Sequence, residues 1–136
     1  ARDLAQIIAI DAEATGLTKP DYWRDLFQHY GTRRHPHRFF LVADREGSVT
    51  GFVIGEIRDW EFGSPACGWG FAINVRADAR LAGLGARLLD AICDKFRHAG
   101  VNQVRTMLAR DNTLILSFFR SQAMIAAPFI TLQRDL

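Results

Sequence analysis

The 136-residue chain has few cysteines, almost no net charge and no long apolar run. Its two cysteines, Cys67 and Cys93, stand apart without a CxxC or Cys/His ligand spacing, so we expect reduced thiols and no metal site. No apolar run approaches the roughly 20 residues that a membrane helix needs. The sequence therefore predicts a cytoplasmic protein without membrane contact.

The balance of charge disfavours a dedicated nucleic-acid binder. Seventeen basic and fifteen acidic residues give a net charge of only +2, too little for the strong field that attracts polyanions. One run, residues 33–38, is locally basic. We interpret it as a solvated loop, with phosphate or nucleic-acid contact as the alternative.

The length of the chain predicts a single domain over residues 1–136. Hydrophobic residues make up 49% and charged residues 24%, which is typical of a globular domain. The chain begins at Ala1 without a methionine, and no charged leader precedes an apolar segment. We therefore expect no secretory signal, and we expect that a first native strand is missing.

Hydrophobic spacing predicts two helices and then an antiparallel meander in the N-terminal half. Apolar residues recur at helical spacing up to Gly16, and a second helix begins near Thr18 and closes at Gly31. Alternating and β-branched residues then predict strands over 39–43, 49–57 and 67–75, with a turn-forming stretch between the first two.

The C-terminal half predicts an alternation of helix and strand. A helix follows Gly83 and ends near Gly100, with an apolar face of Leu84, Leu88, Leu89, Ile92 and Phe96. A strand over 103–109, a helix over 113–122 and a closing strand over 129–133 complete the order ααβββαβαβ. A parallel return needs a crossover, so this order predicts an α/β fold of the α+β type with a mixed central sheet.

One local motif favours anion binding. The strand that ends at Val75 is followed by Arg80, Gly83 and Gly85, directly before the amphipathic helix. Glycines let the backbone approach a ligand, and the first turn of a helix offers unpaired N–H groups and the positive end of its dipole. This arrangement suits a pyrophosphate.

The Arg-x-x-Gly-x-Gly/Ala spacing resembles the coenzyme A signature of the GNAT superfamily of N-acetyltransferases, and the element order is similar over nearly the whole chain. The phrase over residues 10–16, with Asp21-Tyr22-Trp23, looks like a subgroup often labelled histone-acetyltransferase-like. The resemblance implies acetyl-coenzyme A as cosubstrate, held where two parallel strands splay apart.

The resemblance also implies a set of cofactor-binding residues. Strand backbone would pair with the pantetheine arm, and the N–H groups of the glycine turn would surround the pyrophosphate. These positions are Ile73, Asn74, Val75, Arg80, Leu81, Ala82, Gly83, Leu84, Gly85, Ala86, Asn112 and Phe119. Asn112 can equally serve as a helix N-cap, and Arg87 can add charge at the phosphates or point to solvent.

Two departures from the family pattern concern the catalytic groups. Phe119 stands where many relatives carry a proton-donating tyrosine, and Met107 stands where the branch that acetylates N-terminal amines carries a glutamate. Our first candidate for the base is Glu56, which alternation places on the strand face of Phe52 and Ile54. Its alternative role is a charged residue at a sheet edge. Further candidates are Glu61 and Asp59.

These features predict an N-acetyltransferase that moves acetyl directly to a primary amine in a ternary complex, without a covalent enzyme intermediate. A coenzyme A-binding module without catalysis is the alternative. Loops set the choice of acceptor, so a small molecule and a protein amine both stay open. Whether the chain forms a homodimer also stays open. Aromatic residues could line an acceptor pocket or pack in the core: Tyr22, Trp23, Trp60, Phe62 and Trp69.

Overall fold

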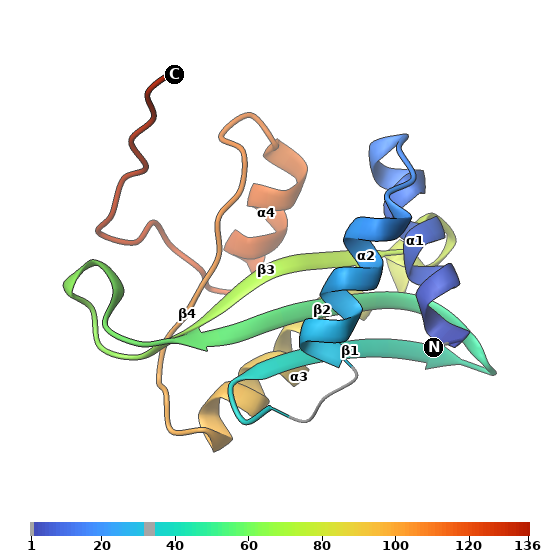
Figure 1. The fold of residues 1–136 in the computed structure, drawn as a ribbon, viewed down its shortest axis with the longest axis horizontal. Helices are drawn as coiled ribbons and strands as arrows, with labels where there is room; N and C mark the ends of the chain where they lie inside the picture. The colour runs from blue at the N-terminus through green and yellow to red at the C-terminus, as the bar shows by residue number, and fades with distance from the viewer. Residues whose placement is uncertain (1, 32–34) are drawn as a thin grey trace. The chain divides into compact units, whose positions relative to one another are not determined.

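The computed structural model describes residues 2–31 and 35–136. The chain divides into two compact units, one reaching to Thr106 and the other spanning Met107–Leu136. In the first unit two helices precede three strands, a third helix and a short strand (Figure 1). The bounds are α1 (Arg2–Thr15), α2 (Pro20–Leu26), β1 (Arg38–Arg45), β2 (Ser48–Arg58), β3 (Cys67–Val75), α3 (Leu84–His98) and β4 (Val104–Arg105).

Three short helical turns complete the first unit. They are the π-helical turn η1 (Phe27–Gly31), which extends α2, and the 3-10 turns η2 (Glu61–Gly63) and η3 (Ala77–Ala82). Of the basic run predicted to be a solvated loop, Arg33 and Arg34 lie outside the described residues. None of the described helices is long and apolar enough to cross a membrane.

The sheet has the order β1-β2-β3-β4, with antiparallel pairing except between β3 and β4, which run parallel. This confirms the mixed sheet and the meander. The predicted strand over 103–109 is correct only for Val104–Arg105, which pair with Gly68 and Trp69. Directly beyond this pair β3 has a bulge, where Phe71 has no partner on β2. Bulges bend the bulged strand, which gives a physical reason for the ladder to stop here.

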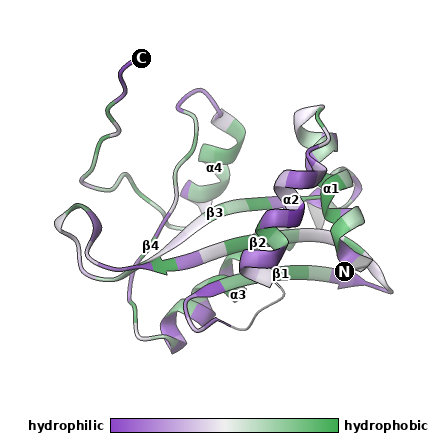
Figure 2. Cartoon of the chain, in the orientation of Figure 1, coloured by the Kyte–Doolittle hydropathy of each residue, from purple (hydrophilic) through white to green (hydrophobic). Residues whose placement is uncertain are grey.

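Each face of the sheet is covered by helices. On one face, α3 packs against a glycine stripe on β2 and β3, so close that a Cβ at Gly55 would lie 2.7 Å from Ile92 Cδ1. Its buried residues are Leu88, Leu89, Ile92 and Phe96, as predicted, and Figure 2 shows apolar and polar residues along the same helix.

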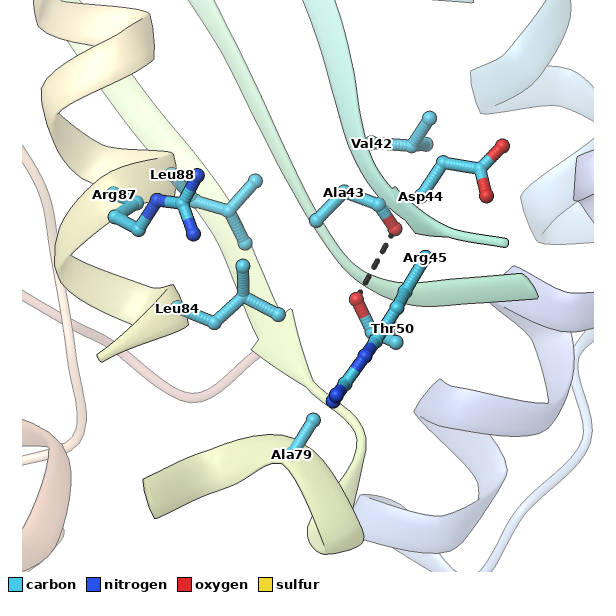
Figure 3. A pocket seen from close by; sticks show the side chains of 9 residues that line it. All are labelled: Val42, Ala43, Asp44, Arg45, Thr50, Ala79, Leu84, Arg87 and Leu88. Carbon is cyan, nitrogen blue, oxygen red and sulfur yellow. Dashed lines mark hydrogen bonds between the residues drawn. The ribbon is translucent and has the colours of Figure 1, made fainter. Parts of the chain in front are cut away.

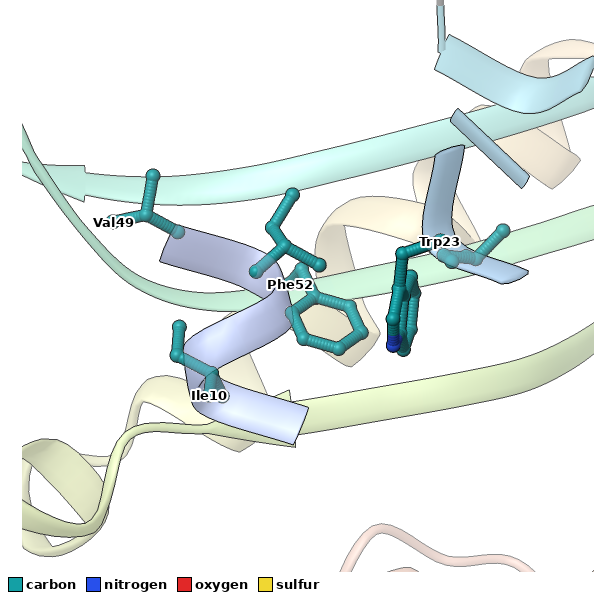
Figure 4. Packing of buried hydrophobic residues seen from close by; sticks show 6 residues of the cluster. Ile10, Trp23, Val49 and Phe52 are labelled. Atoms are coloured by element: carbon teal, nitrogen blue, oxygen red, sulfur yellow. The ribbon is translucent and has the colours of Figure 1, made fainter. Parts of the chain in front are cut away.

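The other face carries a core built by α1 and α2. Its buried residues are Ile7, Ile10, Trp23, Val49, Phe52 and Ile54 (Figure 4). The Trp23 ring stands edge-on to Phe52 at 5.1 Å, and its Nε1 donates a hydrogen bond to Asp11 Oδ2 at 2.9 Å. The carboxylate of Asp11 also pairs with Lys19 at 3.1 Å. Burial of the indole is thereby compatible with its polar N–H.

The second unit contains α4 (Thr113–Ser121), close to the predicted bounds. The predicted closing strand over 129–133 is wrong, because residues 125–136 have no regular secondary structure in the described chain. Ile130 and Leu132 are 85% and 86% exposed. A strand is stabilised by its neighbours in a ladder, and alternation along one segment supplies no neighbour.

Candidate functional site: a glycine turn, a free strand edge and a polar cluster around Glu56

The connection between β3 and α3 has an open helix start. Gly83 precedes α3 with φ +71°, a left-handed conformation that glycine adopts without strain. A Cβ at Gly83 would meet nothing within 4 Å, so space lies open beside this residue. The first bond of the helix runs from the Arg87 N–H to the Gly83 carbonyl at 3.3 Å.

No side chain of the described residues caps α3, and no acidic residue lies in its first turn. The N–H groups of Leu84, Gly85 and Ala86 therefore precede the first helical bond and have no acceptor within the helix. Together with the dipole they favour an anion at this point. This is the geometry that the Gly83-x-Gly85 spacing predicts.

Arg80 supports the same turn from η3. Its Nε donates a hydrogen bond to the Val75 carbonyl at 3.1 Å, which ties η3 to the end of β3. No other partner of this guanidinium is found within residues 2–31 and 35–136, and the side chain is exposed. Arg80 thus links η3 to β3 through its Nε, and its terminal nitrogens can still bind an anion. Leu81 and Ala82 contribute backbone of η3.

The strand β3 keeps one free edge. Ile73, Asn74 and Val75 pair with Val53, Phe52 and Gly51 of β2. On the opposite side β4 reaches only Gly68 and Trp69, so within the described chain no strand lies beside β3 from Gly70 onward. Backbone N–H and C=O groups along such an edge can pair with an extended ligand.

Leu84 and Arg87 lie at a cavity and not at the free edge of β3. They line a cavity of about 580 Å³ between α3 and the β1–β2 hairpin, together with residues of β1, β2 and η3 and none of β3 (Figure 3). The remaining lining residues are Val42, Ala43, Asp44, Arg45, Thr50, Ala79 and Leu88. The side chain of Arg87 is therefore placed away from the free edge of β3.

Glu56 lies in a cluster of polar side chains on the face covered by α1 and α2. Its Oε1 accepts from Arg58 Nε at 3.1 Å, and its Oε2 accepts from the Tyr30 hydroxyl at 3.1 Å. Arg38 Nε lies 4.0 Å from the same Oε2. Tyr30 also packs against the core that contains Ile54, so the predicted strand face of Glu56 is confirmed.

Burial and the negative charge of Glu56 raise the pKa of Tyr30, and Arg38 and Arg58 partly offset this rise. The Tyr30–Glu56 contact could not be predicted from the sequence. The two residues are far apart in the chain, and no local spacing connects them. The one available signal was a polar residue on an otherwise apolar strand face.

The other candidate carboxylates and aromatic residues are more exposed. Glu61 lies 4.0 Å from Arg58 Nε, and Asp59 is exposed. Trp60 and Phe62, at the end of β2, are 72% and 74% exposed and both adopt φ +54°. Trp23 belongs to the core instead, which argues against a role of this ring as a pocket wall. Trp69 is half-buried beneath the Arg58 guanidinium.

Asn112, Phe119 and Met107 belong to the second unit. The Oδ1 of Asn112 accepts from the Ile115 N–H at 3.2 Å, so Asn112 is an N-cap of α4. Phe119 is buried, with its ring 5.2 Å from that of Phe118, and Met107 is exposed. Among the residues described here, no group of three His, Cys, Asp or Glu side chains could hold a metal ion.

A family model described as the acetyltransferase (GNAT) family matches residues 4–123. No curated protein sequence matches the chain. Among solved structures, the aminoglycoside N-acetyltransferase AAC(6')-Iy, in complex with CoA, has 16% identity and a TM-score of 0.83, covering 98% of this chain and 89% of that chain.

Two further solved structures are similar. The ribosomal-protein-alanine N-acetyltransferase from Brucella melitensis biovar Abortus 2308 has 20% identity and a TM-score of 0.75, over 99% of this chain and 93% of that chain. A transcriptional regulator from Bacillus halodurans C-125 has 14% identity and a TM-score of 0.81, over 100% and 95%. Identities this low show the fold alone, but the family model spans most of the sequence. The chain belongs to the acetyltransferase (GNAT) family.

Proposed function

We propose that the chain is an acetyl-coenzyme-A-dependent N-acetyltransferase that moves acetyl directly to a primary amine. The observation that carries this proposal is the uncapped start of α3 behind Gly83, at the end of a strand whose outer edge is free. The first feature suits a pyrophosphate and the second suits an extended arm with two amides. Both are needed to bind coenzyme A.

In this proposal the backbone of Ile73, Asn74 and Val75 pairs with the pantetheine arm. The phosphates are held by the N–H groups of the glycine turn, over residues 81–86, and by the terminal nitrogens of Arg80. Asn112 and Phe119, which belong to the second unit, stay predicted coenzyme contacts on the strength of the family resemblance alone. The solved complex of AAC(6')-Iy with CoA supports the choice of coenzyme for a chain of this family.

Glu56 is the proposed base. An acceptor ammonium must lose a proton before its nitrogen can attack the thioester, and a positioned carboxylate can accept that proton. Arg58 and Tyr30 hold the two oxygens of Glu56 in place. A thiol intermediate is disfavoured, because burial raises the pKa of the Cys67 and Cys93 thiols and so reduces their thiolate fraction.

The proposed acceptor is an amine, either of a small molecule or of a protein. AAC(6')-Iy has been solved with a bisubstrate analog of CoA and acetylneamine, and another similar structure is a ribosomal-protein-alanine N-acetyltransferase. Both kinds of acceptor are therefore compatible with this fold. A cytoplasmic location, a homodimer and the histone-acetyltransferase-like subgroup stay predictions.

The test of transfer is the release of free thiol from acetyl-coenzyme A, measured with a chromogenic disulfide reagent. The acceptor panel contains a polyamine, an aminoglycoside, free amino acids and peptides with α-amines or lysines. We expect turnover with at least one class. Glu56→Gln should reduce kcat about 100-fold or more, while Glu61→Gln, the matched control beside Arg58, should not. Binding of the coenzyme without thiol release from any class would instead support the non-catalytic module.

A further inference from the structure

The structure distinguishes the two tyrosines of the chain. Tyr22, on α2, is 51% exposed. Tyr30, in η1, is half-buried, and its hydroxyl donates a hydrogen bond to Glu56 Oε2 at 3.1 Å. Its ring stands edge-on to Phe71 with 5.1 Å between centroids, and the Arg38 guanidinium lies 5.6 Å from the ring centroid. Tyr30 is thus a phenol fixed by contacts to β1, β2 and β3.

Phe71 lies near the start of the free edge of β3, directly after Gly70. It is the bulged residue, and it follows the last β3–β4 pair, Trp69 with Arg105, by two positions. From Phe71 to Val75 the strand spans about 13 Å. An extended arm that starts at the glycine turn and follows this edge therefore brings its sulfur end toward Phe71, and so toward Tyr30.

We propose that Tyr30 gives its phenolic proton to the sulfur of coenzyme A when the acetyl–sulfur bond breaks, and that Glu56 restores this proton. The inference rests on the proposed function. It assigns to Tyr30 the proton donation that Phe119, which has no hydroxyl, cannot provide.

The step balances as follows. The acceptor ammonium gives one proton to Glu56, and its nitrogen bonds to the acetyl carbon. The carbon–sulfur bond breaks with its electron pair on sulfur, and Tyr30 gives the sulfur a proton. The protonated Glu56 then donates to the Tyr30 oxygen, which reverses the hydrogen bond seen in the structure, and passes its proton to that oxygen. The second proton that the nitrogen loses on forming the amide goes to water.

The relay leaves both of its groups unchanged. The net proton transfer runs from the acceptor ammonium to the sulfur, and Glu56 and Tyr30 return to their starting protonation states. The charged groups that act on Tyr30 are Glu56, Arg38 and Arg58. Burial and the charge of Glu56 raise the pKa of Tyr30 and the two arginines partly offset this rise, so the phenol is protonated at neutral pH and gives up its proton only as Glu56 supplies another.

The test uses free coenzyme A as its probe and needs no acceptor. The thiol of bound coenzyme A is titrated through the ultraviolet absorbance of its thiolate, in the wild type, Tyr30→Phe and the control Tyr22→Phe. A phenol that turns its O–H from Glu56 to the thiolate stabilises the thiolate. We therefore expect the thiol pKa to be about one unit higher in Tyr30→Phe than in the wild type, and unchanged in Tyr22→Phe.

A second measurement covers a Tyr30→Phe variant that does not fold. In the wild type, the phenol titration of Tyr30 should move to higher pH with coenzyme A than with an analogue that lacks the sulfur, because the thiolate opposes a second negative charge. Identical thiol pKa values in wild type and Tyr30→Phe, or identical phenol titrations with the two ligands, overturn the inference and leave the proposed function intact. Failure of the folded wild type to bind coenzyme A overturns both.

Discussion

Gly68 lies in β3 directly beneath the ring of Phe96. A Cβ at this position would approach the ring atom Cγ to 2.6 Å, so the ring or the strand must move. We predict that Gly68→Ala lowers the free energy of unfolding by about 1–3 kcal/mol through overpacking. The matched control is Gly70→Ala, in the same strand, where a Cβ meets nothing within 4 Å. Urea denaturation of both variants is the measurement, and equal losses would contradict the glycine-stripe interpretation.

Because of Tyr30, we predict that the folded protein loses stability at alkaline pH. Its pKa is raised in the folded protein by burial and by the charge of Glu56, so between about pH 10 and the raised value the unfolded chain loses the phenolic proton and the folded chain keeps it. The contribution of Tyr30 is therefore fully present below about pH 10 and decreases above it. The stability difference between wild type and Tyr30→Phe, followed by thermal unfolding, should shrink as pH rises. A difference that stays constant or grows would show that the phenol ionises as easily in the folded state.

Residues of the site differ in how well the sequence could predict them. The glycine turn follows from local spacing, since Gly83 needs its left-handed φ whatever lies elsewhere in the fold. The Tyr30–Glu56–Arg58 cluster depends on the approach of η1 to β2, a tertiary contact without a sequence period. For Arg87 the sequence allows a phosphate contact or exposure to solvent, and the structure shows that it lines the cavity between α3 and the β1–β2 hairpin.

At the scale of elements, α4 offers a test that separates two roles of Asn112. Its Oδ1 caps the helix by accepting from the Ile115 N–H. Asn112→Ala should destabilise by about 1 kcal/mol through loss of the cap, whereas Asn112→Asp keeps an acceptor oxygen and should preserve stability. The measurement is denaturant unfolding of both variants beside calorimetric binding of coenzyme A. If the side-chain amide contacts the arm, Asn112→Asp binds more weakly at unchanged stability. Full binding by this variant would limit Asn112 to capping.

Strands were harder to predict than helices. The helix after Gly83 was predicted well, because its apolar face, the preceding glycine and Gly100 all mark it locally. The strand over 103–109 was predicted from its composition, but pairing with β3 stops at Arg105, beside the bulge at Phe71. The segment over 129–133 alternates as a strand should and yet has no ladder partner in the described chain.

At the scale of the whole molecule, the secondary structure predicts a gradient of backbone protection. Residues 125–136 form no helix or strand, and many of their side chains are exposed, whereas β2 lies between two strands and is covered on both faces. Amides in 130–136 should exchange with deuterium within seconds, and those of β2 should be among the slowest in the chain. Hydrogen exchange read by mass spectrometry tests this. Strong protection of 130–136 would instead indicate that this segment pairs as a strand in solution.

The sequence resemblance consists of the glycine motif and of the element order, and the structure contains the glycine turn and the mixed sheet that these two features predict. The family model matches residues 4–123, a range that contains these elements. The side chains around Glu56 are positioned by contacts between distant segments, such as that of Tyr30 with Glu56, so local sequence spacing does not predict their arrangement.

Binding of acetyl-coenzyme A is the most direct test of the account, and isothermal titration calorimetry measures it. The variants are Gly83→Glu and Gly100→Glu, which add the same charge at the two ends of α3. Both glycines have positive φ, +71° and +90°, and at both a Cβ would meet nothing within 4 Å. The account predicts micromolar binding by the wild type, retention in Gly100→Glu and loss of at least about 100-fold in Gly83→Glu. Equal binding by the two variants, or no binding by the folded wild type, would contradict a coenzyme site at the start of α3.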